Sequence, residues 1–324
     1  MNDEALARSH YRQQAAIVRR VLASVLAWWK RLDGRDLSTS WNAGIGPATL
    51  ALVAAAQLEA ATRAGEYVPA AVEAQGGISE AAGVLVPAVL SGIASDGREL
   101  ATLLYVPVLR AKQLIGDGAT LPDALGEAGR QLAMLVSTQV ADAGRVAASV
   151  AMTADRAIAG YERIVNPPAC SRCIILAGRL YTWSRGFQRH PRCDCVHKTV
   201  THEQWRTENL GNDPRKLFDA MSRAEQDRVF GRAGAEAIRH GADIAQVVNA
   251  RRGMATAGGR RFTSEGATAR GLAGRRLGEL AKQPGGGLYR RSQIPRLMPE
   301  QILLEAAGDR DEAIRLLRRF GYLL

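Results

Sequence analysis

Cys170-Ser-Arg-Cys173 and, after nineteen further residues, Cys193-Asp-Cys195 contain all four cysteines of this chain. A CxxC turn points two sulfurs at one ion because its backbone wraps around them, and a second close pair across a hairpin completes a tetrahedron. Thiolates are soft ligands, and a closed set of four suits zinc. The spacing therefore predicts a structural Zn²⁺ site whose ligands are Cys170, Cys173, Cys193 and Cys195.

Because three histidines lie nearby, the identity of one of the four ligands stays open. His190, His197 and His202 all lie close enough in sequence to replace one thiolate. A structural site needs no fifth ligand. We expect His190, three residues before Cys193, to hydrogen-bond to the site from outside the ligand set. For His197 and His202 we expect ordinary packing or surface positions.

Other interpretations of the cysteines are incidental thiols, disulfides and a redox site. Disulfides need an oxidising compartment, and the N-terminus, with Asp3 and Glu4, lacks the layout of a signal peptide. A thioredoxin-like CxxC needs a βαβ pattern around it, which the sequence does not show. We therefore expect a cytoplasmic protein with reduced thiols. Zinc would supply the folding free energy for a segment of about 30 residues with little apolar surface.

The residues before the cysteines favour helices. Apolar residues make up 47% of the chain but aromatic ones only 5%, so most apolar side chains are small and suit close-packed helices. From Glu4 to Leu32 apolar residues recur at spacings of three, four and seven. Pro87 and Pro107 should kink or end helices. We expect helices at about 4–32, 48–64, 79–91, 97–115, 121–137 and 138–165, with a break near Ser137.

Composition divides the chain into five parts, and the expected fold class is mainly α. Asn166-Pro167-Pro168 ends the first helical region because a residue before proline is pushed out of the α basin. Ser222 and Glu225 form a capping box that opens a later helix, and Asp309 is the N-cap of the last one. The parts are a helical domain (1–165), a small zinc-type α+β cysteine module (166–212), a helical segment (213–250), a basic, partly extended arm (251–296) and a C-terminal helix (297–324).

Most of the positive charge lies in the arm. The chain has a net charge of +11, and the glycine-rich residues 251–296 contribute eleven basic side chains against two acidic ones. Such a segment favours a polyanion and would contact phosphates without reading bases. The alternative is a solvated linker in a protein that uses arginine freely. The residues expected to contact nucleic acid are Arg251, Arg252, Arg260, Arg261, Arg275, Arg276, Arg290 and Arg291.

Membrane insertion is not expected. A membrane span needs roughly 18 to 20 consecutive apolar residues. The best candidate, residues 81–94, is shorter and is interrupted by Gly83, Pro87 and Gly92.

The cysteine segment is similar to a known family. Cys170-Ser-Arg-Cys-Ile-Ile-Leu-Ala-Gly-Arg-Leu-Tyr181, with Gly186-Phe187-Gln-Arg-His190-Pro191-Arg192-Cys193-Asp194-Cys195, resembles the MuF-like domain of tailed phages, named after the minor head protein F of phage Mu. Gly241–Met254 and Arg296–Glu300 look like the C-terminal part of actinobacteriophage minor capsid proteins. The N-terminal half is only generically similar. The resemblance implies a low-copy head component, encoded near the portal, that assists procapsid assembly and can travel with the DNA.

We therefore expect a minor capsid protein rather than an enzyme. It would lie in the virion, in the capsid interior or near the portal, with the portal or major capsid protein and packaged double-stranded DNA as partners. Some relatives carry a protease or toxin domain, but no GxSxG elbow is present here. One alternative is a zinc-containing nucleic-acid-binding protein, although no recognition helix lies beside the cysteines. The other is a metal-dependent nuclease using Asp194 and a histidine, which four cysteine ligands would leave without an open position.

Overall fold

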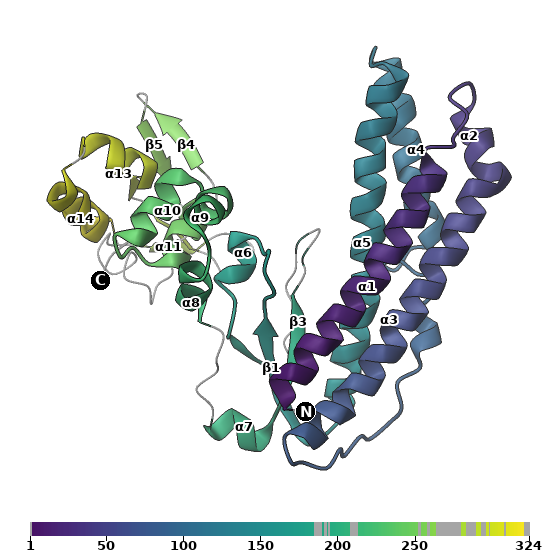
Figure 1. Cartoon of the computed structure of the whole chain (residues 1–324), viewed down its shortest axis with the longest axis horizontal. Coiled ribbons are helices and arrows are strands. Elements are labelled where there is room, and N and C mark those ends of the chain that lie inside the picture. Colours follow the sequence, from purple (N-terminus) through teal and green to yellow (C-terminus); the bar gives the residue numbers. More distant parts are fainter. Residues whose placement is uncertain are drawn as a thin grey trace. The chain divides into compact units, whose positions relative to one another are not determined.

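The computed structural model describes residues 2–184, 190, 193, 195–207, 213–251, 254–257, 260–263, 280–282, 290–292, 296–297, 299–307 and 309–320. The chain is mostly helical with a small three-stranded sheet, which confirms the expected mainly α class (Figure 1). Its contacts divide it into two compact units. The first comprises Met1–Asn166 with Gly178–Gly211, and the second comprises Pro167–Ala177 with Asn212–Leu324.

Four long helices that pack side by side form the bulk of the first unit (Figure 1). Their contact faces carry branched apolar side chains at helical spacing, such as Val21 and Val25 on the first helix and Leu132 and Val136 on the last. Buried alanines such as Ala60 let the helix axes approach closely. The helices are α1 (Asp3–Trp29), α3 (Gly46–Ala74), α4 (Leu100–Gly116) and α5 (Leu121–Ala154), and the short α2 (Leu37–Ser40) and π-helical η1 (Trp41–Ile45) precede α3.

Pro107 does not end α4, so of the two expected outcomes, a kink or an end, the structure excludes the end. α4 continues through Pro107, and α3 likewise continues through Pro69 to Ala74. A proline inside a helix removes one backbone hydrogen bond. Leu104 and Val108, on either side of Pro107, are fully buried against the bundle core, and this packing holds the helix together.

The predicted helix at 79–91 is wrong. This segment holds only a short 3-10 turn, η2 (Pro87–Leu90), and otherwise follows the outside of the bundle. The Ala82 N–H donates to the Ala154 carbonyl at 2.8 Å, and the Ser91 hydroxyl donates to the Ala54 carbonyl at 2.8 Å. The apolar side chains of this run, such as Val84, Val86 and Val89, stay exposed, so burial of an apolar face does not stabilise a helix here.

α5 runs through Ser137 without a break and ends at Ala154, so the predicted break and the helix extending to 165 are wrong. The Asp155 carboxylate accepts hydrogen bonds from the Ser79 hydroxyl at 2.6 Å and the Glu80 N–H at 2.9 Å, which draws the chain away from the helix. The strand β1 (Ile158–Ile164) follows. All seven of its residues are buried, so no alternation of apolar and polar residues marks it in the sequence.

β1 is the central strand of an antiparallel sheet with the order β2-β1-β3. Tyr161 pairs with Tyr181 on one side, and Arg163 pairs with His197 on the other. The Tyr67 hydroxyl of α3 donates to the His197 carbonyl at 3.1 Å, which fixes β3 to the bundle. The sheet anchors both cysteine segments, because one follows β1 and the other precedes β3. The flanking strands are β2 (Leu180–Thr182) and β3 (Val196–Thr201), and the helix α7 (His202–Thr207) follows β3.

Among the described residues, one helical stretch, Leu37–Ala74, is long and apolar enough to cross a membrane by length and composition. That is weak evidence for a membrane span, because core helices of soluble proteins pass the same test. This stretch buries Val53, Ala60 and Val68 in the first unit, where α3 packs against α1 and α5.

Short helices make up most of the described part of the second unit. The capping box of Ser222 and Glu225 and the N-cap at Asp309 are both confirmed. Phe218 and Phe230 pack edge to face in its core, with ring centroids 5.2 Å apart. The helices are α6 (Ser171–Ile174), α8 (Pro214–Asp219), α9 (Arg223–Phe230), α10 (Arg232–Arg239), α11 (Ile244–Ala250), α13 (Pro299–Glu305) and α14 (Arg310–Arg319).

The arm predicted at 251–296 contains short strands. One antiparallel sheet has the order β4-β5-β8, and β6 pairs with β7 in a second sheet. The strands are β4 (Met254–Ala257), β5 (Arg260–Thr263), β6 (Leu280–Lys282), β7 (Arg290–Ser292) and β8 (Arg296–Leu297).

Candidate metal centre

The first cysteine pair lies in a loop whose two ends are joined at β1. The Arg163 N–H donates to the Arg179 carbonyl at 3.1 Å, and the Gly178 N–H donates to the Arg163 carbonyl at 3.1 Å. Inside the loop, the Cys173 N–H donates to the Cys170 carbonyl at 3.0 Å. The CxxC backbone therefore turns as its spacing predicts. Cys170 is exposed, whereas Cys173 is only 2% exposed.

The second cysteine pair is held by arginines from α5 and β1. The Arg145 guanidinium donates to the Cys195 carbonyl at 3.0 Å and also to the Cys193 carbonyl. The Arg163 guanidinium donates to Cys193 Sγ at 3.3 Å. The Cys193 N–H donates to the His190 carbonyl at 2.9 Å, which turns the chain between these two residues. Both thiols of this pair are buried.

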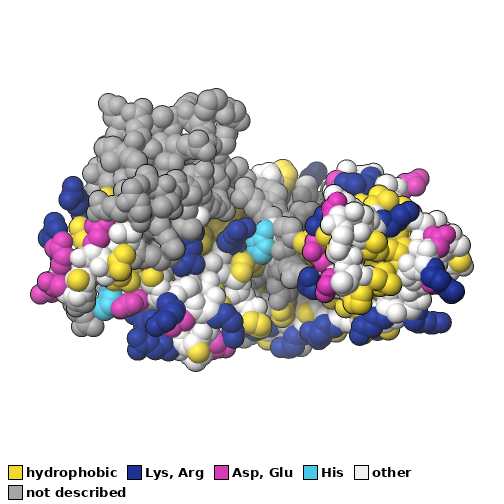
Figure 2. All heavy atoms as spheres, turned by 90° about the horizontal axis from the view of Figure 1, so that it is seen from above, with side chains coloured by type: hydrophobic (Ala, Val, Ile, Leu, Met, Phe, Trp, Pro, Cys, Tyr) yellow, Lys and Arg dark blue, Asp and Glu magenta, His cyan; other side chains and the backbone are white. Residues whose placement is uncertain are grey.

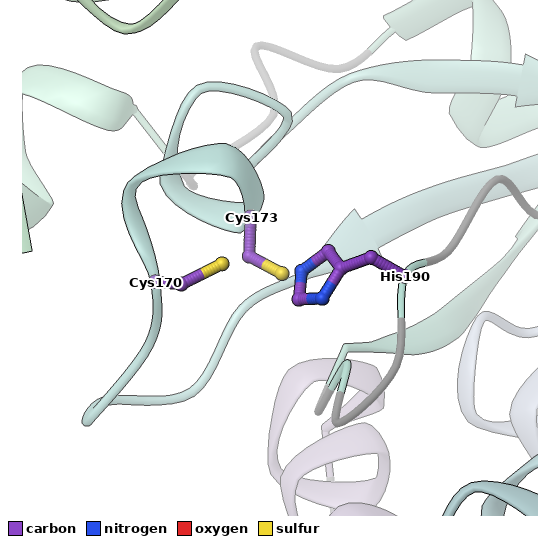
Figure 3. A group of neighbouring side chains, drawn as sticks. All are labelled: Cys170, Cys173 and His190. Atoms are coloured by element: carbon purple, nitrogen blue, oxygen red, sulfur yellow. The ribbon is translucent and has the colours of Figure 1, made fainter. Parts of the chain in front are cut away.

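Cysteine and histidine donors converge in two overlapping groups. The sulfurs of Cys170 and Cys173 and a ring nitrogen of His190 lie within 4.8 Å of one another, and so do the sulfurs of Cys173, Cys193 and Cys195. Figure 3 shows the first group, with both sulfurs and the imidazole ring turned toward one another. Ligands of one tetrahedral zinc ion lie roughly 3 to 4 Å apart, given metal–ligand bonds of about 2.0 to 2.3 Å. These clusters could hold a metal ion.

The two groups contain every residue predicted for the metal site. Cys173 belongs to both, and a ring nitrogen of His190 lies within 4.8 Å of both sulfurs of the first pair. Five donors are therefore available for the four positions of a tetrahedral site. The ligand set of four cysteines, with His190 outside it, stays a prediction.

His197 and His202 lie outside both groups. His197 is 2% exposed, and its ring stands edge-on to Tyr161 with centroids 4.5 Å apart. His202 is exposed at the start of α7. These positions match the packing and surface roles expected for them. Asp194, which the nuclease interpretation needs, lies outside the described residues.

A cavity of about 260 Å³ beside the second cysteine pair was not predicted from the sequence. Residues of α1, α5 and β3 line it, among them His10, Arg145, Cys193 and His197. His10 is buried, its ring stacks on Tyr67 with centroids 4.3 Å apart, and its Nδ1 has no hydrogen-bond partner among the described residues. The only signal for its burial is its helical spacing in α1. Burial lowers the pKa of His10 from 6.5 to about 4.

The buried His10 predicts a loss of stability in mild acid. The pKa of His10 is lower in the folded chain than in the unfolded chain, so the unfolded chain binds more protons between pH 6.5 and about 4. This contribution to stability is complete above pH 6.5 and falls by about 2 kcal/mol at pH 5. Urea unfolding at pH 7.5 and pH 5, with a chelator present, measures this loss of stability. His10→Phe keeps a ring against Tyr67 and should show the smaller pH dependence. The same pH dependence in both proteins would assign the effect to other groups.

The residues predicted to contact nucleic acid are described only in part. Arg251 is half-buried and packs beside Gly231 and Gly234. On the face shown in Figure 2, the described Lys and Arg side chains are spread among acidic and apolar ones. For Arg260, Arg261, Arg290 and Arg291 the structure describes the strand backbone alone, and Arg252, Arg275 and Arg276 lie outside the described residues.

Comparison with known proteins places most of the chain in one family. A family model described as VG15 protein matches residues 1–224 of the 324-residue chain. The matched range includes the long helices, the sheet and both cysteine pairs. Gly241–Met254 and Arg296–Glu300, where further resemblance was expected, lie outside it. No curated protein and no solved structure was found to match. The chain therefore belongs to the VG15 protein family, a family of phage gene proteins.

Proposed function

We propose that this protein is a minor capsid protein of the MuF-like type, which assists head morphogenesis near the portal of a tailed phage and has no enzymatic activity. The observation that carries the proposal is the phage family match over residues 1–224. That range includes the cysteine pairs on which the resemblance to the MuF-like domain rests. The agreement of a whole-domain match with a local motif is what favours a phage structural protein.

We further propose that the cysteine module binds one structural Zn²⁺. Four thiols and an imidazole are the donors available, and such soft ligands favour zinc over magnesium or calcium. The ion would join the loop after β1 to the loop before β3, in a region whose described residues form three short strands and the short α6. Four protein ligands leave no position for an activated water, so the metal would act on folding and not on a substrate.

The bundle and the arm would have different partners. Apolar side chains stand out from the segment between α3 and α4, including Val84, which is 93% exposed, and Val89, which is 61% exposed. Exposed apolar residues in a row are a feature of protein interfaces, so this side of the bundle is a surface for portal or major capsid protein. The basic arm would contact packaged double-stranded DNA through phosphates, independently of sequence.

Purified virions of the phage that encodes this chain provide the test. We expect quantitative mass spectrometry to find the protein in heads at low copy, and ultraviolet irradiation of DNA-filled heads to crosslink peptides from 251–296 to DNA. A chain truncated after Ala250 should enter heads without forming this crosslink. Empty heads control for crosslinking without DNA. Absence of the protein from both procapsids and virions would refute the proposal.

A further inference from the structure

We infer that Arg163 and Arg145 are positioning residues of the metal centre. Arg163 stabilises the Cys193 sulfur when that sulfur binds the ion, and Arg145 fixes the backbone that presents Cys193 and Cys195. The inference rests on the metal site proposed above. Both arginines lie outside the cysteine segment and set the affinity of the site for a soft divalent cation.

Arg163 contacts both cysteine-bearing loops, one through its backbone and the other through its side chain. Its backbone closes the first loop through the hydrogen bonds to Gly178 and Arg179, each 3.1 Å long. Its side chain, which is buried, donates to Cys193 Sγ in the second loop at 3.3 Å. The sheet makes this possible because Arg163 pairs with His197, two residues beyond the end of the second loop.

Arg145 holds the second loop by its backbone. Its guanidinium spans the carbonyls of Cys193 and Cys195, which are two residues apart, and so fixes the curvature of the chain between them. The guanidinium is itself held by Asp142, at 3.1 Å, and Asp142 accepts a hydrogen bond from the Ser95 hydroxyl at 2.8 Å. Sulfurs on a backbone fixed in this way lose less conformational freedom when they bind a metal.

Buried arginines suit an ion that is surrounded by thiolates. A divalent cation with four thiolates carries two net negative charges, and replacing one thiolate by imidazole leaves one. A buried anion is costly unless cations or N–H donors surround it. Arginine stays protonated and directs several N–H groups in a fixed geometry. Partners outside the ligand set typically contribute about 10- to 100-fold to metal affinity.

The test compares Zn²⁺ affinities of full-length variants by competition with a chromophoric chelator. R163M should bind Zn²⁺ about 10- to 100-fold more weakly, and R163K, which keeps a charged donor, should recover part of the loss. R145K keeps the charge beside Asp142 but cannot span both carbonyls, so it should bind about tenfold more weakly. R156M, at an exposed arginine just after α5, is the matched control and should bind as the wild type does.

A second readout separates positioning from a general effect on folding. With Co²⁺ in place of Zn²⁺, the sulfur-to-cobalt charge-transfer absorption should shift in R163M and not in R156M. Urea unfolding in the presence of EDTA measures the stability of each metal-free protein. Variants that lose metal-free stability but keep wild-type Zn²⁺ affinity and an unchanged cobalt spectrum would overturn the inference. If R163M does not fold, R163K and R145K decide the same question. A wild type that binds neither ion would overturn the metal centre itself, which is a distinguishable result.

Discussion

Replacing Cys173 by Ser is expected to weaken metal binding about a hundredfold and to remove most of the stability that depends on the metal. Structural zinc sites in small peptides have apparent binding free energies of about 10 to 16 kcal/mol, so one of four ligands accounts for on the order of 3 kcal/mol. Cys173 should show the full loss because its buried sulfur belongs to both donor groups. Zinc content after dialysis, and thermal unfolding with and without EDTA, measure both effects.

Cys170→Ser is the matched comparison for this variant. Cys170 lies in the same turn, but it is exposed and belongs to one donor group only. We expect a smaller loss of affinity, because His190 is close enough to complete the ligand set in its place. Wild-type zinc content in the Cys173 variant would contradict a centre built around that residue. Equal losses of affinity in both variants would show that the two groups form one site to which Cys170 and Cys173 contribute equally.

Local sequence patterns explain those parts of the candidate site that lie close together in the chain. A CxxC turn is formed by its own backbone, and His190 lies three residues from Cys193, so neither relation depends on the rest of the fold. The same holds for α1, whose apolar residues recur along one helical face, and for the Ser222 capping box, which spans four residues. Structure that is encoded within one or two turns can be predicted from sequence.

The arginines around the second cysteine pair could not be predicted in this way. Arg145 and Cys193 are 48 residues apart, and Arg163 and Cys193 are 30 apart. These contacts arise only after α5 and β1 have packed beside the loop. An arginine in a helical pattern also indicates a solvated position, because charged residues are seldom fully buried. The two side chains most closely tied to the second cysteine pair therefore had no signal in the sequence.

Two segments were misjudged for opposite reasons. β1 is buried on both faces, so it lacks the alternation that marks a half-exposed strand, and it directly follows a long alanine-rich helix. Residues 81–94 are apolar yet lie on the surface of the bundle, where Val84 is almost fully exposed. Burial in the fold, rather than hydrophobicity in the sequence, decides which pattern a segment displays.

The sheet gives the second prediction with a large expected effect. Gly160→Ala should lower the free energy of unfolding by about 3 kcal/mol or more. Gly160 lies in β1 next to an irregularity in its pairing with β3. A Cβ at this position would lie 2.0 Å from the Tyr181 carbonyl oxygen and 2.9 Å from the Thr182 Cα. Overpacking in a core typically costs about 1 to 3 kcal/mol when side chains can adjust. Here the obstacles are backbone atoms, so β2 itself must move.

That movement should reach the metal site, because β2 begins directly after the loop that carries Cys170 and Cys173. We therefore expect Gly160→Ala to lower zinc affinity as well as the urea midpoint measured in EDTA. Gly44→Ala is the control, since a Cβ there meets nothing within 4 Å, and it should be as stable as the wild type or slightly more stable. A Gly160 variant as stable as the Gly44 variant would show that β2 is not held against β1. Lower stability with unchanged zinc affinity would show instead that the first cysteine pair is placed independently of β2.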